Sequence, residues 1–472
     1  MQRRKIRRRP DAPLPTVPMA MKKPDDPSPE RGQAERGQDQ RGLAVPSARM
    51  ARLARFGGLG AGIVGNMVAE GAQRLARGQR PSLQDLLLTP SNAAMAADQL
   101  SRLRGAAMKL GQLLSMDDGD FVPPEFAEPL SRLRSSAHEM PPRQLRGVLA
   151  RDWGRDWLSR FEQFDVRPIA AASIGQVHRA VTRDGRKLAL KVQYPGVRES
   201  IDSDIDNLAS IIRIAGVLPK EVNIAPLLEE AKKQLGEEAD YERESARVKR
   251  FQALLKGSED FVVPDVHDDF TTRNILAMSY APGAPIDALT ALPQAERDRI
   301  ATALIDLALR ELFEFRLMQT DPNFANFFRD EDTGKIILLD FGAARDIEPA
   351  LAEGYQALLA AAIRGDWADA HAAALRMGLI DDDTPARLET LLRETYDIAM
   401  EPMRHKGPYD FSASDLAARL RDNVVALRTS GFSQPPPPAA MFIHRKLGGL
   451  YLIATKLAAR VDINGLVTRW TA

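Results

Sequence analysis

The feature that most limits how this chain of 472 residues can fold is a pair of polar segments that lie nineteen positions apart. Asp321 is followed five positions later by Asn326, and Asp340 opens the tripeptide Asp-Phe-Gly. The apolar run before this tripeptide, Lys335–Leu339, is predicted to be a strand. Carboxylate and amide oxygens are ligands that Mg²⁺ prefers, so we expect the fold to bring these three side chains together.

The same spacing is found in the catalytic loop and the D-F-G segment of protein kinases. In that loop the first carboxylate orients the attacking hydroxyl or accepts its proton, while the Asn and the second Asp bind the Mg²⁺ that bridges the nucleotide phosphates. Asp321 is therefore the candidate catalytic acid, and Asn326 and Asp340 are the candidate metal ligands. The alternative interpretation is that all three are ordinary solvated loop residues.

A second constraint is a lysine in the apolar run Leu188–Lys191, which is similar to the kinase strand whose lysine contacts the α- and β-phosphates. An ammonium group in such a run is unfavourable without a partner, although a lone lysine there is more often at a sheet edge. The preceding segment matches the last Gly and the Val of G-x-G-x-x-G-x-V, but alanines replace the first two glycines. Because methyl groups narrow such a loop, we expect it to bind nucleotide differently. Besides the lysine, the candidate nucleotide-contacting residues are Ala170, Ala171, Ala172, Ser173, Gly175 and Val177.

An acidic cluster, Glu237–Glu244, lies on a helix predicted for residues 224–255. Asp240 and Glu244 are four positions apart and would share a face of that helix, so one of them is expected to pair with Lys191. A solvated helix face is the alternative interpretation of this cluster.

Composition excludes several other kinds of site. The chain has no cysteine, so disulfides, thiolate metal sites and a cysteine nucleophile are excluded, and its six histidines form no H-E-x-x-H pair. No G-x-x-x-x-G-K-[ST] sequence is present, which excludes the Walker type of nucleotide site. Residues 1–50 hold 12 Lys and Arg against 6 Asp and Glu, whereas the rest of the chain holds 53 against 58. This nearly neutral body argues against nucleic acid as the main partner.

Four regions are predicted along the chain: a disordered basic and proline-rich tail (1–48), a helical N-terminal extension (49–165), a small β-rich lobe (166–284) and a helical lobe (285–472). A solvated tail, an electrostatic tether to anionic lipid and a targeting sequence all remain open for the first region. The uncharged run Phe56–Ala69 is too short to span a bilayer. In the last region we expect an irregular segment at 318–328 and a final helix from about Ala439.

Taken together, these segments resemble the UbiB (AarF) family of atypical protein-kinase-like proteins. The resemblance runs from about residue 106 to residue 346. Its most specific parts are K-L-G-Q at 109–112, which matches the K-x-G-Q element, and the alanine-rich loop. E-A-D at 238–240 matches the E-x-D element, and Q-T-D-P-N at 319–323 is closer to the mitochondrial coenzyme-Q branch than to the D-P-H-P-G-N form.

The resemblance implies an α+β, protein-kinase-like two-lobed fold with a helical N-terminal extension packed over the active site. It implies that Lys191 contacts phosphates and pairs with Glu244, and that the catalytic acid and metal ligands are those proposed above from the residues. It also implies that Lys109 on the extension pairs with a carboxylate of the E-x-D element. The implied regulatory residues are Lys109, Gln112, Glu238 and Asp240.

In function the resemblance implies a Mg²⁺-dependent, ATP-binding atypical kinase or ATPase in ubiquinone biosynthesis or isoprenoid-lipid homeostasis. The cofactors would be ATP and Mg²⁺. The partners would be a quinone-precursor lipid, an anionic membrane surface or a ubiquinone-biosynthesis complex. The site of action would be the cytoplasm or the surface of the inner membrane, or the mitochondrial matrix in a eukaryote.

Two alternatives stay open. One is a nucleotide-sensing accessory protein that needs no turnover, and the other is a small-molecule kinase of the aminoglycoside or choline type, which the K-x-G-Q element disfavours.

The segments that bind peptide substrates in protein kinases are incomplete in this sequence. Gln319 and Thr320 replace the His and Arg of H-R-D, so the Arg that binds a phosphorylated activation loop is missing, and no A-P-E follows. A peptide-docking platform therefore lacks its usual parts, and water or a small hydroxyl is the expected acceptor.

Overall fold

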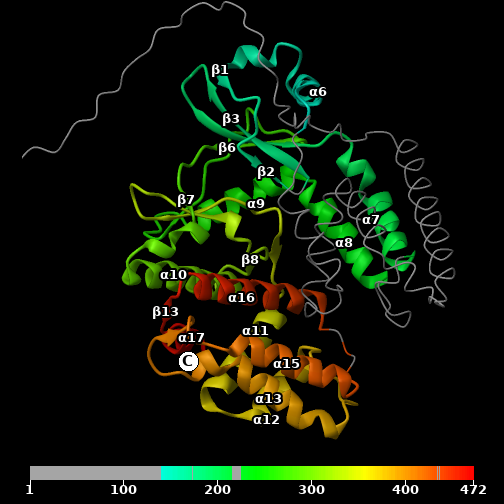
Figure 1. Ribbon diagram of the computed structural model, residues 1–472, viewed down its shortest axis with the longest axis vertical. Helices are drawn as coiled ribbons and strands as arrows, with labels where there is room; N and C mark the ends of the chain where they lie inside the picture. Colours follow the sequence, from blue (N-terminus) through cyan, green and yellow to red (C-terminus); the bar gives the residue numbers. More distant parts are fainter. Residues whose placement is uncertain (1–139, 173, 215–224, 433, 435, 472) are drawn as a thin grey trace, which may run out of the picture. The chain divides into compact units, whose positions relative to one another are not determined.

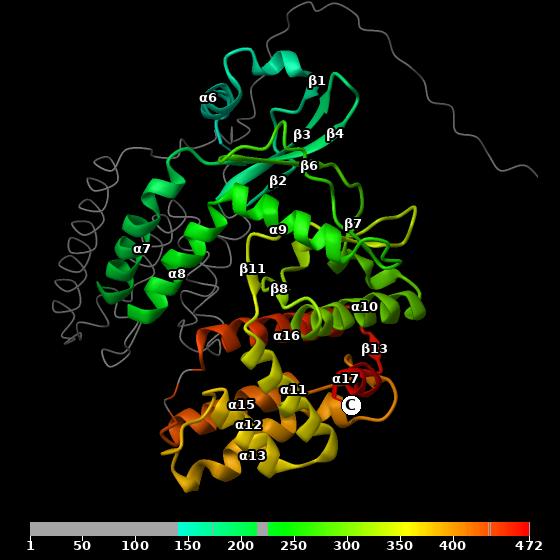
Figure 2. The same cartoon turned by 180° about the vertical axis from the view of Figure 1, so that it is seen from behind.

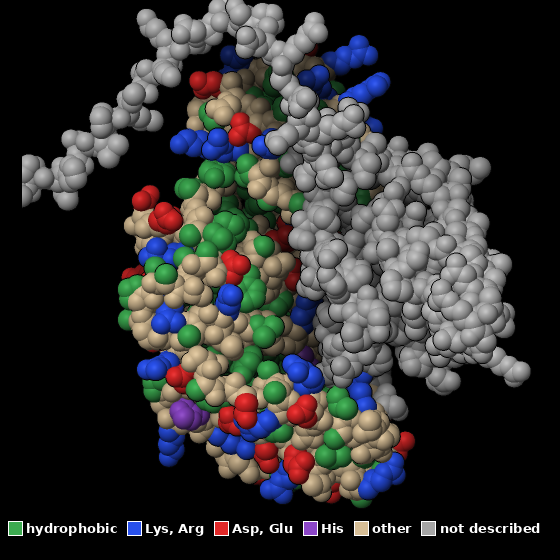
Figure 3. Space-filling view, viewed as in Figure 1, with side chains coloured by type: hydrophobic (Ala, Val, Ile, Leu, Met, Phe, Trp, Pro, Cys, Tyr) green, Lys and Arg blue, Asp and Glu red, His purple; other side chains and the backbone are tan. Residues whose placement is uncertain are grey.

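The computed structural model describes residues 140–172, 174–214, 225–432, 434 and 436–471. These residues form an α+β structure in which a five-stranded sheet and four α-helices precede a mainly helical region (Figure 1). Among the helices in these ranges, none combines the length and the apolar character that crossing a bilayer requires. On the face drawn in Figure 3, Lys and Arg side chains are interspersed with Asp and Glu rather than gathered by sign.

The first sheet is antiparallel, with strand order β1-β3-β4-β6. Strand β2 pairs with the beginning of β3, on the same edge as β1, which pairs with its end. Its strands are β1 Phe161–Phe164, β2 Ala170–Ala171, β3 Gly175–Thr182, β4 Lys187–Gln193 and β6 Ile275–Ser279. Strands β3 and β4 form a hairpin: they pair along their length and are joined by a turn in which Gly185 has a φ of 86°. Only glycine adopts such a φ without strain.

The alternation of side chains along β4 decides where its lysine points. Leu188, Leu190 and Val192 are fully buried and pack with helix α6 (Pro142–Trp153) on one side of the sheet. Because successive side chains of a strand point to opposite faces, Lys191 lies on the other side.

Three helices follow β4: α7 Val197–Ile214, α8 Ala225–Glu238 and α9 Tyr241–Leu254. Helices α7 and α8 lie side by side (Figures 1 and 2). The prediction of one helix over 224–255 is wrong, because two separate helices, α8 and α9, occupy this range and the helical conformation is interrupted between them. The physical reason is Asp240, whose carboxylate caps α9 by accepting a hydrogen bond from the backbone N–H of Arg243 at 3.0 Å. Asp240 therefore lies outside the helix that carries Glu244, and the two do not share a helix face.

A second sheet, of order β5-β10-β9-β7, and a two-stranded pair, β8 with β11, support the polar segments. Their strands are β5 Phe261–Val262, β7 Ala284–Pro285, β8 Leu317–Gln319, β9 Phe327–Arg329, β10 Ile336–Leu338 and β11 Ala344–Asp346. The strand predicted over 335–339 is present as β10. The prediction of an irregular segment at 318–328 is wrong at both ends, where β8 and β9 lie, and holds only for the loop between them. Three-residue strands carry no periodic pattern and form only because a partner strand is present.

The remaining helices are α10 Gln294–Phe313, α11 Pro349–Arg364, α12 Trp367–Arg376, α13 Glu389–Ala399, α14 Glu401–Arg404, α15 Leu416–Thr429, α16 Pro438–Lys456 and α17 Ile463–Thr471. Strand β12 (Tyr409–Asp410) pairs with β13 (Arg460–Val461). The helix expected from about Ala439 is α16, but it is not the last, because β13 and α17 follow. Helices α10 and α16 lie side by side (Figures 1 and 2).

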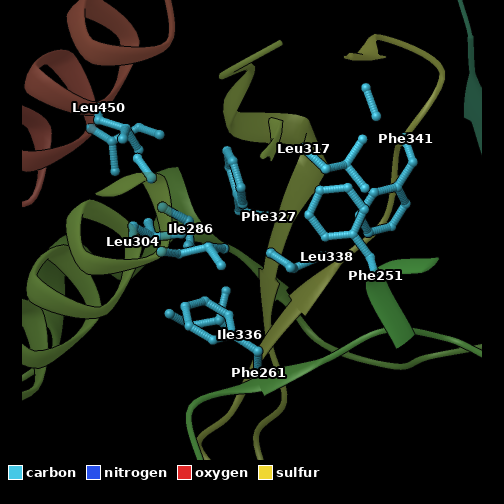
Figure 4. Packing of buried hydrophobic residues seen from close by; sticks show 14 of the residues in the cluster. Phe251, Phe261, Ile286, Leu304, Leu317, Phe327, Ile336, Leu338, Phe341 and Leu450 are labelled. Atoms are coloured by element: carbon cyan, nitrogen blue, oxygen red, sulfur yellow. The ribbon is translucent and has the colours of Figure 1, made fainter. Parts of the chain in front are cut away.

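The core beneath the D-F-G segment is built from aromatic and branched side chains. The rings of Phe251 on α9 and Phe341 are 4.6 Å apart between centroids, and Leu317, Phe327 and Leu338 from the short strands pack in the same cluster (Figure 4). Phe341 is fully buried, so its packing fixes the backbone on which the neighbouring Asp340 is held.

Candidate functional site

Lys191 is the centre of the candidate site. Its Nζ lies 2.9 and 3.0 Å from the two carboxylate oxygens of Glu244, and 3.2 Å from Oδ2 of Asp340. The side chain of Glu244 is 1% exposed and that of Lys191 is 12% exposed, whereas that of Asp340 is 36% exposed. Strand β4, helix α9 and the end of β10 therefore each contribute one charge, and only the acid after β10 is open to solvent.

The electrostatics of this group follow from burial. Burial alone would lower the pKa of Lys191, but the carboxylates of Asp340 and Glu244 raise it well above its ordinary value, so the ammonium keeps its charge. Burial raises the pKa of Glu244 to about 7, against the opposing influence of Lys191. The ring of Tyr241, at the start of α9, lies 5.3 Å from the ammonium, and burial also raises the pKa of its hydroxyl.

The loop between β8 and β9 is hydrogen-bonded to the D-F-G segment. Nδ2 of Asn326 donates to the main-chain oxygen of Asp321 at 3.0 Å, and the N–H of Leu339 donates to the main-chain oxygen of Asn326 at 3.1 Å. The hydroxyl of Thr320 donates to the main-chain oxygen of Ala343 at 2.8 Å. Asp321, Asn326 and Asp340 are thus brought to one region, as their spacing predicts.

The donor set suits a magnesium ion. The amide NH₂ of Asn326 is directed at Asp321, which leaves its amide oxygen as the atom to offer a cation. Oδ1 of Asp340 accepts from the N–H of Gly342 at 2.9 Å, which fixes the carboxylate. No group of three or more His, Cys, Asp and Glu side chains is arranged to hold a metal in the described ranges. Mg²⁺ is characteristically held by one or two carboxylates, with phosphates and water completing its coordination, so two oxygen ligands fit it.

The alanine-rich segment forms a tight connection between β2 and β3. Ala170 and Ala171 pair with Val177 and Gln176, and the N–H of Ala172 donates to the main-chain oxygen of Gly175 at 2.9 Å. A Cβ at Gly175 would lie 2.3 Å from the main-chain oxygen of Val192 on β4, so this position requires glycine. Val177 lies directly opposite Lys191 in the β3–β4 pairing.

Two of the predicted regulatory residues, Glu238 and Asp240, lie at the junction of α8 and α9. Lys109, Gln112 and Ser173 lie outside the described residues. Asp240 caps α9, and one of its oxygens lies 3.7 Å from a guanidinium nitrogen of Arg198. Glu238 is the last residue of α8.

The segment after D-F-G is held by ion pairs that the sequence alone did not indicate. Both carboxylate oxygens of Asp346 are bound, one by Arg247 and one by Arg250 of α9, each at 2.7 Å. Its neighbour Arg345 binds Glu237 of α8 at 2.9 Å. Charge-assisted hydrogen bonds of this kind are strong, so the segment is ordered by its own carboxylate.

Helix α16 contributes two more charged residues that the motifs did not identify. Arg445 forms an ion pair with Asp321. Nζ of Lys446 lies 3.1 Å from Oε2 of Glu311 on α10 and 3.4 Å from Oε1 of Gln319, and all three side chains are buried. Lys446, Glu311 and Gln319 line a small cavity together with Asn326 and Asp340. In the sequence, the only indication of these ion pairs is that Arg445 and Lys446 stand next to each other in a mostly apolar segment. Cations that become buried with such a segment require charged partners.

Known proteins that are similar to this chain include atypical kinases. A family model described as the ABC1 atypical kinase-like domain matches residues 132–374. The Caenorhabditis elegans protein named atypical kinase coq-8, mitochondrial, is 38% identical over 90% of this chain, which spans 57% of that protein's length. The Saccharomyces cerevisiae protein named atypical kinase COQ8, mitochondrial, is 36% identical over 89% of this chain and 84% of its own length.

Among solved structures, a Mycobacterium tuberculosis protein, Rv3197 in complex with erythromycin, is similar with a TM-score of 0.55 and 26% identity over 78% of this chain and 92% of that one. The lysine, the two acids and the asparagine thus lie in a fold of the protein-kinase type, as the motif spacing predicts. The chain belongs to the ABC1 atypical kinase-like family.

Proposed function

We propose that this protein is a Mg²⁺-dependent, ATP-using atypical kinase or ATPase that acts in coenzyme Q biosynthesis. The observation that carries the proposal is the contact of one buried ammonium, that of Lys191, with both Glu244 and Asp340. In protein kinases the corresponding Lys–Glu pair and metal-binding Asp must both be in place for phosphoryl transfer. The names of the relatives support the same assignment.

In this proposal each residue has a role that its surroundings support. Lys191 binds the nucleotide phosphates while Glu244 holds its ammonium in position. Asp340 and Asn326 provide the oxygen ligands for the metal. Bound Mg²⁺ would supply neutralisation of the charge that develops on the transferred phosphoryl group. Asp321 orients the acceptor hydroxyl and, in the transfer step, accepts its proton on a carboxylate oxygen.

The acceptor in this proposal is water or a small hydroxyl compound rather than a protein. Only six residues separate Gly342 from Pro349, where α11 begins, and the ion pairs of Asp346 and Arg345 hold that segment against α8 and α9. A segment so short and so firmly held offers little surface on which a peptide could dock.

The finer setting of this activity is also a proposal. We place the protein at the surface of a membrane that carries anionic lipid, with a quinone-precursor lipid or a ubiquinone-biosynthesis complex as its partner. The mitochondrial names of the relatives and the basic segment at residues 1–48 support this setting.

The test measures Mg²⁺-dependent ATP turnover by the full chain, with and without anionic liposomes, and quinone production in a host that lacks its own family member. Asp340→Asn should abolish both activities. Asp332→Asn, which changes an exposed acid in the turn between β9 and β10, is the matched control and should leave both unchanged. Turnover that persists in Asp340→Asn would contradict the proposal. Loss of turnover with quinone production retained would favour the nucleotide-sensing alternative.

A further inference from the structure

We propose that Arg445, on helix α16, is the positioning residue for the catalytic-loop acid Asp321. This inference rests on the proposed function. One guanidinium nitrogen of Arg445 forms an ion pair with Oδ1 of Asp321, although the two residues are 124 positions apart. The arginine side chain is 9% exposed and the aspartate side chain 22% exposed, so the contact is largely shielded from solvent.

The catalytic loop carries no cation of its own. Residues 319–326 read Gln-Thr-Asp-Pro-Asn-Phe-Ala-Asn, so a charged partner for Asp321 has to come from elsewhere in the fold. An arginine suits this purpose better than a lysine, because its planar, rigid group of donors fixes the orientation of a carboxylate. With Oδ1 held by Arg445, Oδ2 is turned toward Nδ2 of Asn326, 3.4 Å away, and hence toward the candidate metal ligands.

Helix α16 is shaped to lie against this loop. A Cβ at Gly449 would lie 2.1 Å from Cγ of Pro322, so the helix can approach the loop only because residue 449 has no side chain. Gly449 and Arg445 are four positions apart and therefore share one face of α16. The neighbouring Gly448 would meet nothing within 4 Å, which shows that the close approach is confined to that face.

A second set of contacts connects the same helix to the backbone of Asp321. Lys446 is bound to Glu311 and lies 3.4 Å from Oε1 of Gln319, whose Nε2 donates to the main-chain oxygen of Asp321 at 2.8 Å. Helix α16 therefore restrains both the backbone and the carboxylate of Asp321. Such restraint matters because a small displacement of a reacting group can lower a rate greatly.

The experiment measures steady-state ATP turnover of Arg445→Ala, Arg445→Lys, Asp321→Asn and the double variant Arg445→Ala/Asp321→Asn, using the full chain. We expect Arg445→Ala to lower kcat about 10- to 100-fold with KM for ATP changed by less than about twofold, and Arg445→Lys to recover part of the loss. If Arg445 acts through Asp321, the double variant should be no slower than Asp321→Asn alone.

A merely structural role would lower the melting temperature and leave kcat of the folded fraction unchanged. Should Arg445→Ala fail to fold, the comparison of Gly449→Ala with Gly448→Ala serves instead. The former should lower kcat by displacing the helix from Pro322, and the latter should leave kcat unchanged. Wild-type kcat in Arg445→Ala, or losses that multiply in the double variant, would overturn this inference while leaving the proposed function intact. The proposed function fails separately if Asp340→Asn still turns over ATP.

Discussion

The ammonium of Lys191 lies 3.2 Å from the carboxylate of Asp340, although 149 positions separate the two residues in the chain. Lys191 is placed by the alternation of β4, and Asp340 by the buried ring of Phe341 beside it. Two independent local patterns therefore meet at one point. The partners of this ammonium, Glu244 and Asp340, differ in exposure, so only one side of the group is accessible to a ligand.

The first prediction concerns pH. Glu244 has a pKa of about 7 in the folded protein, because burial raises it from its ordinary value of 4.5. The folded state therefore holds a proton that the unfolded chain releases between these pH values, and the contribution of Glu244 to stability declines as pH rises from about 4.5 to 7. ATP turnover should instead rise with pH over this range, because only the carboxylate form of Glu244 pairs fully with Lys191.

The measurement is urea unfolding and ATP turnover from pH 5 to pH 8 for the wild type and for Glu244→Gln. The unfolding free energy of the wild type should fall relative to that of Glu244→Gln as pH rises toward 7, because glutamine stays neutral and resembles the protonated form of Glu244. The acidic fall in turnover should be absent from the residual activity of the variant. A stability difference that stays constant over this range would contradict the prediction.

The second prediction concerns Gly175. Replacing it with Ala forces a methyl group against the main-chain oxygen of Val192, so β3 and β4 must separate locally. We expect a loss of about 1–3 kcal/mol in unfolding free energy, together with weaker nucleotide binding. Gly147→Ala is the matched control: this residue is exposed within α6 with nothing near its Cβ position, and the change should stabilise the protein by about 0.5–1 kcal/mol. Equal stability of the two variants would show that the close approach at Gly175 is not limiting.

The third prediction concerns the alanine-rich loop. Ala170→Gly and Ala172→Gly should alter the affinity for ATP or the preference between ATP and ADP, because glycine gives the loop backbone conformations that alanine lacks. The N–H of Ala172 is bonded to Gly175, so this variant tests the tight turn itself, whereas Ala170 lies in the paired strand β2. Calorimetric titration with each nucleotide measures the effect. Unchanged binding of both nucleotides in both variants would remove this account of the loop.

The fourth prediction concerns the buried pair of Glu311 and Lys446. Lys446→Met should lower the unfolding free energy by about 3–5 kcal/mol, because it leaves the carboxylate of Glu311 buried without its cation. Glu311→Leu combined with Lys446→Met should recover most of that loss. Lys456→Met, near the exposed end of the same helix, is the control and should change stability by less than about 0.5 kcal/mol. Urea unfolding of the four proteins decides the matter, and equal losses in the single and double variants would contradict the expectation.

Site residues could be predicted from the sequence where they belong to short motifs, but not where their role depends on a partner far away in the chain. The lysine of β4, the loop acid and the D-F-G acid were identified because each lies within a few residues of its motif. Helix spacing alone did not decide between Asp240 and Glu244 as the partner of Lys191, because the answer depends on a helix break that the capping carboxylate of Asp240 creates. Arg445 belongs to no motif, and its partner lies far upstream, so nothing short of the tertiary fold could connect them.

Strand pairing also bears on how this protein could be divided. Strands β5 and β7, which flank β6 in the chain, pair with β10 and β9, while β6 itself belongs to the first sheet. The segment from Phe261 to Pro285 thus contributes strands to both sheets. If the chain were cut between residues 284 and 285, each fragment would contain strands whose backbone hydrogen-bonding partners lie in the other fragment. Reconstituting an active enzyme from pieces, or permuting its termini, should therefore succeed only with cuts placed outside this segment.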